Sequence, residues 1–228
     1  MTKMKLIKGL VVATATSVLV ACGATVTEKP AQAEAAPEVA VKITPKMAST
    51  TVNLGGSDVT IMRNQDENNN VNPAFAKTSR KCPPFCIRPF STAKGVETIA
   101  ELEVISYIEK LAAGENVMVV DNRTPDWFVK GTIPGAVNVP FTKINRSKGA
   151  DDVSIAESLE LFGAVEGSKG WDFSKAKTLV MFCNGMWCGQ SPLGIDGIMA
   201  EGYPAEKIKW YRGGMQDWEI LGLSTVQP

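Results

Sequence analysis

The chain has 228 residues, of which 24 are basic and 24 acidic, and it contains no histidine. The balanced charge gives no reason to expect nucleic acid or another acidic polymer as a partner, because such partners are bound through an excess of Lys and Arg. The lack of histidine excludes a nucleophile activated by a Cys–His pair. A catalytic cysteine in this chain must therefore be activated by other groups.

The N-terminus has the pattern of an export signal. Three lysines within the first eight residues precede a mostly apolar run at 9–21, which is too short to span a bilayer comfortably. The run ends in LVAC, residues 19–22, which resembles the lipobox of bacterial lipoproteins. That resemblance implies a signal peptide over 1–21, acylation of Cys22 and a periplasmic place in the bacterial cell envelope. Gly23, rather than Asp, implies anchoring in the outer membrane; a cleaved signal without lipid is the alternative.

The next two segments are predicted to have little regular structure. Residues 22–50 are rich in Ala, Pro, Thr, Glu and Val without a hydrophobic period, which is typical of an extended tether. Residues 51–95 form an irregular extension with one short strand at 59–62, an Asn-rich turn at 64–70 and the segment CPPFC. The remaining length is enough for one compact domain.

Five cysteines in an exported chain need an explanation, because an oxidising compartment seldom leaves thiols unused. With Cys22 acylated, two close pairs remain, Cys82 with Cys86 and Cys183 with Cys188. The first pair is either a small structural disulfide or a partner of the second pair in thiol exchange. Four thiolates are also a ligand set that zinc accepts, so a zinc site with four cysteine ligands is a further alternative.

From residue 96 the patterns of helix and strand alternate. A capping box, TIAE at 98–101, predicts the start of an amphipathic helix that closes at Gly114. The bare apolar run at 117–120, followed by Asp121, is typical of a buried strand. Thr-Pro at 124–125 predicts a short helix, since proline suits the first helical position.

The second half continues the alternation. Further strands are predicted at 137–139, 178–182 and 208–211, and further helices at 154–162, 191–202 and 215–222. A second capping box, SIAE, opens the first of these helices, and Ser191 is expected to cap the second. Bare apolar strands that alternate with helices predict an α/β fold with a mainly parallel sheet covered on both faces.

The stretch FCNGMWCGQSP, residues 182–192, connects a predicted strand to a predicted helix. Ligands of an open α/β sheet bind beyond the carboxyl ends of its strands, and Cys183 lies at such a place. Free N–H groups and the positive end of the helix dipole near Ser191 would stabilise a thiolate or persulfide there. Gly185 and Gly189 allow the backbone to curl so that several amides converge on one point.

Four segments together resemble the successive motifs of a single rhodanese domain. They are DNR at 121–123, KGTIPGAVNVP at 130–140, Cys183 at the start of a short loop, and YRGGMQDW at 211–218. The resemblance implies a rhodanese-like domain over 96–228, with a mainly parallel five-stranded sheet flanked by helices and no cofactor or metal. It also implies that Cys183 accepts a sulfane sulfur as a persulfide and passes it to a thiol or cyanide.

The same resemblance assigns the residues around the nucleophile. Asp121 and Arg123 match the family's Asp-x-Arg and are expected to hold loops together rather than do chemistry. Trp187 is expected to be exposed near the nucleophile and to influence substrate size. The loop whose amides would cradle the sulfur comprises Asn184, Gly185, Met186, Trp187 and Gly189.

Two positions depart from the family's pattern. Thr132 stands where the family usually has histidine, at a position that is usually structural. Cys188 stands five residues after the nucleophile, where thiosulfate-using members often carry Arg or Lys. A cation there would pair with the sulfonate of thiosulfate and lower the thiol pKa, so its absence weakens the assignment of thiosulfate. Gly189 at the sixth position leaves no arginine for a phosphatase loop.

Cys188 is instead predicted to act as a resolving thiol. A loop curled around an anion brings its ends together, so Cys188 can attack a persulfide or mixed disulfide on Cys183. The alternatives are a permanent disulfide between the two, thiol–disulfide exchange instead of sulfur transfer, and a non-catalytic binding module. The expected partners are a small sulfur donor and a thiol acceptor such as a periplasmic thiol protein, with membrane contact through the lipid anchor only.

Overall fold

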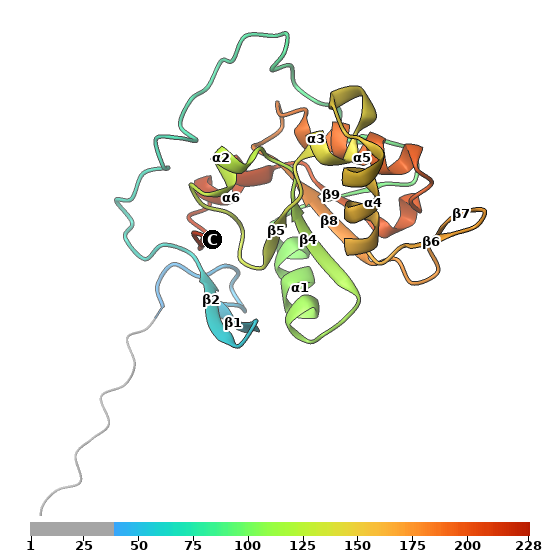
Figure 1. Cartoon of the computed structure of the whole chain (residues 1–228). Helices are drawn as coiled ribbons and strands as arrows, with labels where there is room; N and C mark the ends of the chain where they lie inside the picture. The colour runs from blue at the N-terminus through green and yellow to red at the C-terminus, as the bar shows by residue number, and fades with distance from the viewer. Residues whose placement is uncertain (1–38) are drawn as a thin grey trace, which may run out of the picture. The chain divides into compact units, whose positions relative to one another are not determined.

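The computed structural model describes residues 39–228 (Figure 1). The predicted signal peptide, Cys22 and most of the predicted tether lie outside the described residues. The five strands of the central sheet are β3 (Glu97–Ile99), β4 (Val117–Asp121), β5 (Ala136–Asn138), β8 (Thr178–Phe182) and β9 (Ile208–Tyr211). Their order is β3-β9-β8-β4-β5, and every neighbouring pair is parallel. The predicted α/β fold with a five-stranded parallel sheet is confirmed.

The helices cover both faces of this sheet (Figure 1). They are α1 (Glu101–Ala112), α2 (Pro125–Phe128), α3 (Phe141–Ile144), α4 (Asp152–Leu161), α5 (Gln190–Ala200) and α6 (Gly214–Ile220), with 3-10 turns η1 (Arg146–Lys148) and η2 (Ala205–Lys207). Successive strand residues point to opposite faces, so Val119 packs in the cluster with α1 and α6, whereas Val120 packs with α3, α4 and α5. Burial on both faces explains why these strands read as unbroken apolar runs.

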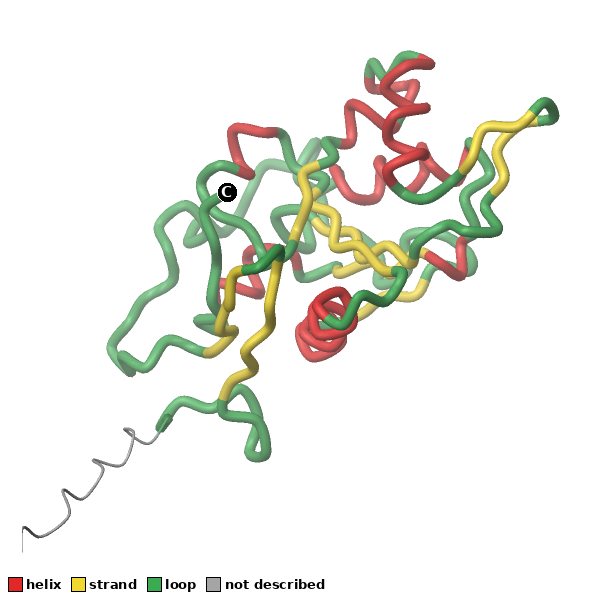
Figure 2. Tube along the Cα trace, turned by 60° about the horizontal axis from the view of Figure 1, so that its bottom comes forward, coloured by secondary structure: helices red, strands yellow, loops and turns green. Residues whose placement is uncertain are grey.

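Two antiparallel hairpins accompany the sheet. One is β1 (Ser49–Leu54) with β2 (Ser57–Met62), and the other, which projects from the domain in Figures 1 and 2, is β6 (Val165–Gly167) with β7 (Gly170–Asp172). The sequence predicted only the strand at 59–62, and β1 begins inside the segment predicted as a tether. The signal for the hairpin was Gly55-Gly56, whose φ values of 61° and 90° suit a two-residue turn. Ile61 is fully buried against the sheet.

The start of α1 differs from the prediction. Thr98 and Ile99 lie in β3, because Ile99 pairs with Tyr211 of β9 and the Thr98 hydroxyl donates a hydrogen bond to the carbonyl of Phe90 at 2.6 Å. The helix begins two residues later. The prediction that TIAE forms the capping box of this helix is therefore wrong.

Two other helices begin earlier than predicted. At α4 the side chain of Asp151 accepts a hydrogen bond from the Ser154 N–H at 2.8 Å, so Asp151, not Ser154, is the capping residue. At α5 the residue before the helix is Gly189, and Ser191 lies inside the first turn. Ser191 therefore does not cap α5, and its hydroxyl is available for another partner.

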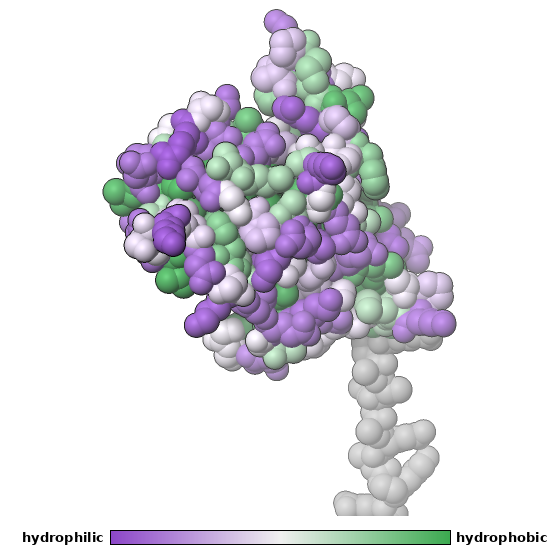
Figure 3. Space-filling view, turned by 90° about the vertical axis from the view of Figure 1, so that its right-hand side faces the viewer, coloured by the Kyte–Doolittle hydropathy of each residue, from purple (hydrophilic) through white to green (hydrophobic). Residues whose placement is uncertain are grey.

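Residues 64–96 contain no helix or strand and cross the domain as a long loop (green in Figure 2). Polar and apolar residues are interspersed over the face of the molecule seen in Figure 3. Within residues 39–228, no helix is both long enough and apolar enough to cross a membrane.

Candidate active site

Cys183 directly follows β8, the central strand of the sheet, at its carboxyl end. The loop from Cys183 to Gly189 then leads into α5. The first turn of α6 holds the start of this loop, since the Met215 N–H donates to the carbonyl of Cys183 and the Gln216 N–H to that of Asn184, both at 3.0 Å. The nucleophile predicted from the sequence thus lies where ligands of open α/β sheets bind.

Gly214 is required for this contact between α6 and the loop. Its φ is +59°, a conformation that side chains with a Cβ rarely adopt, and a Cβ there would lie against the backbone of Cys183 and Gly185. The second glycine of the YRGG motif therefore allows α6 to approach the loop.

The thiol of Cys183 is only 2% exposed and accepts a hydrogen bond from the Ser191 hydroxyl at 3.1 Å. The indole N–H of Trp210 donates to the Ser191 oxygen at 3.0 Å. Because an indole N–H only donates, the single hydrogen of Ser191 is left to point at the sulfur. Ser191, which the sequence predicted as a helix cap, is a donor to the nucleophile.

These donors make Cys183 more acidic than an ordinary thiol. Burial raises its pKa, but hydrogen bonds from the Cys188 thiol, the Ser191 hydroxyl and the N–H groups of Ser191 and Gly185 lower the pKa overall, to about 7. Burial and the neighbouring Cys183 raise the pKa of Cys188 well above its usual value. Cys183 is therefore partly ionised near neutral pH, whereas Cys188 stays protonated.

Cys183 and Cys188 are both free thiols, and the loop brings them together. The Cys188 N–H donates to the Gly185 carbonyl at 2.8 Å, which closes a turn within the loop. Met186 is 38% exposed at the tip of that turn. The permanent bridge between the two cysteines, one of the alternatives from the sequence, is absent from the described structure.

Asp121 and Arg123 form a fully buried ion pair with a shortest distance of 2.6 Å. Arg123 also donates to the Gly131 carbonyl at 2.7 Å and to the Asn184 side-chain oxygen at 3.5 Å. Thr132 donates its hydroxyl to Asp121 at 2.8 Å. This buried network joins the loop after β4, the loop before β5 and the cysteine loop.

The extension packs directly on the cysteine loop, as the alternative of thiol exchange between the two cysteine pairs requires. The Arg88 N–H donates to the Met186 carbonyl at 2.8 Å. Arg212 donates to the carbonyl of Arg88 at 2.7 Å and to that of Pro89 at 3.0 Å. Gln216 donates to the carbonyl of Phe75 at 3.1 Å. Residues 75–89 are thus fixed to the active-site end of the domain.

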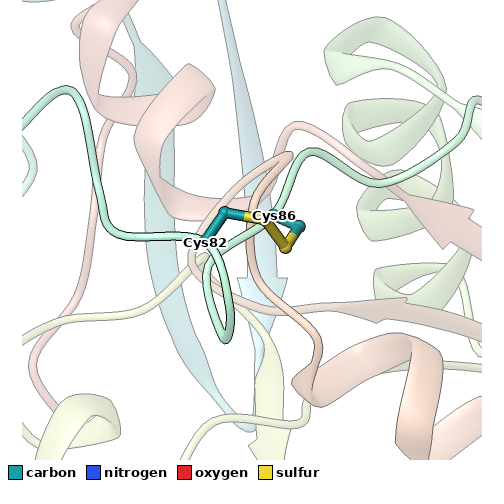
Figure 4. Close-up of a disulfide and its surroundings, with 2 residues drawn as sticks. All are labelled: Cys82 and Cys86. Carbon is teal, nitrogen blue, oxygen red and sulfur yellow. A yellow bond between two sulfur atoms is a disulfide. The ribbon is translucent and has the colours of Figure 1, made fainter.

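Cys82 and Cys86 form a disulfide across a tight turn of the extension, with Cα atoms 4.6 Å apart (Figure 4). The pair is bonded internally and not to either thiol of the loop. Phe85, inside the turn, meets the ring of Trp187 edge to face, with centroids 5.6 Å apart. The disulfide therefore closes the turn that places an aromatic ring on the cysteine loop.

Trp187 is half-buried rather than freely exposed, which corrects the expectation from the sequence. Phe85 covers one part of its ring, and the guanidinium of Arg80 lies 3.8 Å from the ring centroid. Its indole N–H donates to the side-chain oxygen of Gln216 at 2.7 Å. Trp187 is therefore held in place between the extension and α6.

A pocket of about 390 Å³ opens beside the cysteine loop. Cys188 faces it, whereas Cys183 is not part of its lining. The lining comes from the extension, the loop and the helices α2 and α5: Arg80, Pro84, Phe85, Arg88, Trp127, Asn184, Trp187, Cys188, Gly189, Gln190 and Leu193. A larger cavity of about 470 Å³, between residues 62–72 and 219–225, contains no nucleophilic thiol, and we do not assign it to the site.

The arrangement does not fit a zinc site with four cysteine ligands. Two of the four cysteines are joined in a disulfide and cannot act as thiolate ligands. Within residues 39–228, no group of three or more His, Cys, Asp or Glu side chains comes together to hold a metal.

The structure thus combines a parallel five-stranded α/β sheet with an acidified thiol at the carboxyl end of its central strand. The family model described as rhodanese-like domain matches residues 105–221, just over half of the chain. The chain belongs to the rhodanese-like domain family. A comparison with curated proteins gives no match.

Several solved structures resemble the chain. The human single domain sulfurtransferase TSTD1 is 20% identical, covering 54% of this chain and 95% of that one, with a TM-score of 0.34. A rhodanese-like domain protein from Staphylococcus aureus is 22% identical over 57% of this chain and 97% of its own, with a TM-score of 0.37. The As-Sb reductase from Leishmania major is 17% identical over 54% and 76%, with a TM-score of 0.39.

Sequence reasoning missed the residues that the extension contributes to the site. Arg80 and Arg88 flank the two cysteines of the segment RKCPPFCIR, and this concentration of basic residues around a cysteine pair was the available signal. Ser191 was noted for a different role. Gln216 lies in the YRGGMQDW motif and was not singled out.

Proposed function

We propose that the protein is a rhodanese-like sulfurtransferase in which Cys183 carries a sulfane sulfur as a persulfide and passes it to a thiol acceptor. The observation that carries this proposal is the lowered pKa of Cys183 at the end of β8. A thiolate is the nucleophilic form of cysteine, and its donors can also stabilise the anionic persulfide that it forms.

The reaction has two steps. The Cys183 thiolate attacks the outer, sulfane sulfur of the donor, the donor's S–S bond breaks, and the leaving group departs with the electron pair. An acceptor thiolate then attacks the outer sulfur of the persulfide, and Cys183 leaves as a thiolate. Ser191 and the N–H of Gly185 donate to the sulfur of the free Cys183, and the same donors would stabilise the negative charge of the persulfide.

Cys188 provides a second way to unload the persulfide. Its sulfur attacks the inner sulfur on Cys183, forming a Cys183–Cys188 disulfide, and the outer sulfur leaves as hydrosulfide with the proton of Cys188. A dithiol reductant from solution then restores both thiols. The support for this route is the hydrogen bond between the two thiols. Burial and the neighbouring Cys183 raise the pKa of Cys188, so its proton must pass to the leaving sulfur as Cys188 attacks.

Intact-mass measurement after treatment with thiosulfate or polysulfide tests the main proposal. We expect wild type to gain the mass of one sulfur atom on Cys183, and Cys188→Ser to gain it and retain it longer. Cys183→Ser should gain nothing at the loop and should lose all transfer to added thiols. Unchanged transfer by Cys183→Ser would rule the proposal out.

Thiol–disulfide exchange is the second candidate. It is favoured by one observation, that Cys188 lines the pocket while Cys183 is buried behind the loop surface. Equilibration with a buffered dithiol and disulfide mixture, followed by alkylation and peptide mapping, distinguishes the two. A readily formed and readily reduced Cys183–Cys188 disulfide without any sulfur adduct supports exchange. Neither adduct nor disulfide would favour a non-catalytic binding module.

We also propose that the protein is an exported lipoprotein, anchored through Cys22 in the outer membrane and facing the periplasm. The support is the sequence of residues 1–22 together with the Cys82–Cys86 disulfide, since such bonds persist in oxidising compartments. A periplasmic thiol protein would then be the acceptor. Incorporation of labelled palmitate into wild type but not into Cys22→Ser tests the anchor.

A further inference from the structure

Two arginines of the extension, Arg80 and Arg88, border the pocket without a salt bridge among the described residues. The Nε atoms of Arg80 and Arg88 are buried and make no hydrogen bond within residues 39–228. No carboxylate oxygen of the described residues lies within 4.0 Å of either guanidinium, since the ion pairs of this part of the chain all involve other residues. Partly buried cations without a counter-ion are unfavourable unless a ligand supplies the negative charge.

Both guanidiniums are held at the wall of the pocket. Arg80 stacks on the ring of Trp187, and the Arg88 side chain occupies the space in which a Cβ of residue 189 would lie. Because residue 189 is glycine, the Arg88 side chain of the extension can lie against the loop at the position where many family members place a cation of their own. The charge of Arg88 acts on Asp196, whose pKa is raised by burial and lowered only in part by Arg88.

Apart from Asn184 and Gln190, the rest of the pocket is mostly apolar, and a thiol lies in its wall. Phe85, Trp127 and Trp187 contribute aromatic rings, and Cys188 lies at the wall. A volume of about 390 Å³ lies within the range of sites for organic ligands, about 300–1,000 Å³, and is large for a small inorganic anion. The pocket thus offers a reactive sulfur, an aromatic surface and two positive charges.

We propose that Arg80 and Arg88 form the anion-binding end of the pocket, and that the ligand is an organic sulfur compound with a carboxylate or sulfonate group. Its sulfur reaches the thiols, its apolar body lies against the aromatic rings, and its anion binds the two guanidiniums. The extension in this way supplies the cation that the loop lacks at Cys188. The sulfur end of this assignment rests on the proposed function, whereas the anion end does not.

The first test measures binding without chemistry. In the full-length protein carrying Cys183→Ser and Cys188→Ser, calorimetry compares mercaptobenzoate with its uncharged amide. We expect the carboxylate to bind about tenfold more tightly, as charge-assisted hydrogen bonds of about 1.5–3 kcal/mol permit. Adding Arg80→Gln and Arg88→Gln should remove this preference. The backbone contacts of Arg88 to Met186 and Arg212 remain in that variant, so the extension should stay docked.

Lys81→Gln is the matched control, because it removes a positive charge from the same segment at a residue that does not line the pocket. It should leave the preference for the carboxylate unchanged. Equal affinity for the acid and the amide in the parent protein, or an equal loss in Lys81→Gln and in the arginine variants, would overturn the anion site. If thiosulfate bound as tightly as mercaptobenzoate, the proposal that the ligand has an organic body would be overturned.

A second test joins the anion site to the thiols. Dithiobis(nitrobenzoate) is an aromatic disulfide with carboxylates, and dithiodipyridine is one without. With either reagent the protein thiolate attacks one sulfur, the S–S bond breaks, and an aromatic thiolate leaves. We expect the rate ratio of the two reagents to fall about tenfold in the double arginine variant. If wild-type thiols react with neither reagent while the binding preference holds, the proposed function fails and the anion site stands.

Discussion

The two cysteine pairs have similar spacing but opposite surroundings. Cys82 and Cys86 lie in a turn of the extension, near the surface, and form a disulfide. Cys183 and Cys188 are 2% and 4% exposed, stay as free thiols, and are surrounded by hydrogen-bond donors. The first pair closes a turn in a wall of the pocket, and the second contains a thiol whose pKa is lowered by its donors. The difference shows that surroundings, more than spacing, decide what a cysteine pair does.

The largest expected effect on stability comes from the buried Asp121–Arg123 ion pair, whose network reaches the loop of Cys183 and Cys188. Asp121→Asn leaves Arg123 buried with no full counter-charge, and should lower the free energy of unfolding by about 3–5 kcal/mol. Urea denaturation measures this loss. Glu97→Gln, which breaks the exposed pair with Lys209, is the control and should cost no more than about 1 kcal/mol. Equal costs would mean that the buried Asp121–Arg123 pair contributes no more to stability than the exposed Glu97–Lys209 pair.

The next effect concerns the glycine that lets α6 reach the loop. Gly214→Ala should destabilise the protein by about 2–4 kcal/mol, because strain at positive φ adds to a clash with the loop backbone. Gly55→Ala has the matching φ of +61° with open space around the Cβ, so it should cost only about 1 kcal/mol. Thermal unfolding of both variants gives the comparison. A smaller loss for Gly214→Ala than for Gly55→Ala would contradict the close contact between α6 and the loop.

The acidity of the reactive pair gives a third prediction. As the pH falls through about 7, the Cys183 thiolate is protonated and its rate of alkylation by iodoacetamide should fall. Ser191→Ala removes one donor to the thiolate and should raise the midpoint of this pH profile by about one unit or more. Ser191→Thr keeps the hydroxyl and should move the midpoint less. An unshifted profile in Ser191→Ala would mean that the other donors alone set the acidity.

The smallest effect is expected for the disulfide pair. Replacing Cys82 and Cys86 with serine together opens a very short loop, so the protein should lose at most about 2 kcal/mol of stability. The pH midpoint of Cys183 should not change, because no side chain of the extension donates to its sulfur. Fluorescence of Trp187 should change, since Phe85 packs on it. A shift in the pH midpoint of Cys183 would mean that the Cys82–Cys86 pair influences the loop thiols, and would support thiol exchange between the two cysteine pairs.

The sheet and the nucleophile could be predicted from the sequence, since both depend on local patterns. Runs such as VMVV at 117–120 are buried on both faces and therefore read as unbroken apolar strands. Helix starts were less predictable, because a capping pattern can be replaced by another structure. Asp151, not Ser154, caps α4, and the first two residues of TIAE lie in β3.

The extension could not be predicted because its structure depends on contacts distant in sequence. Its backbone is fixed by side chains such as Arg212, 124 residues from Arg88, rather than by any repeating pattern of its own. For the same reason, the part of the pocket that is lined by the extension could not be predicted from the sequence. A segment without helix or strand gives no periodic signal, even where every contact of its backbone is specific.

The hydrogen bonds from Arg212 to the backbone of the extension have a consequence for how the protein can change over time. They bind carbonyl groups, which every residue offers, so the side chains of the extension are free to vary while its path stays the same. The path of the extension over the domain is thus set by its backbone and by Arg212, so substitutions at its exposed side chains should leave that path unchanged.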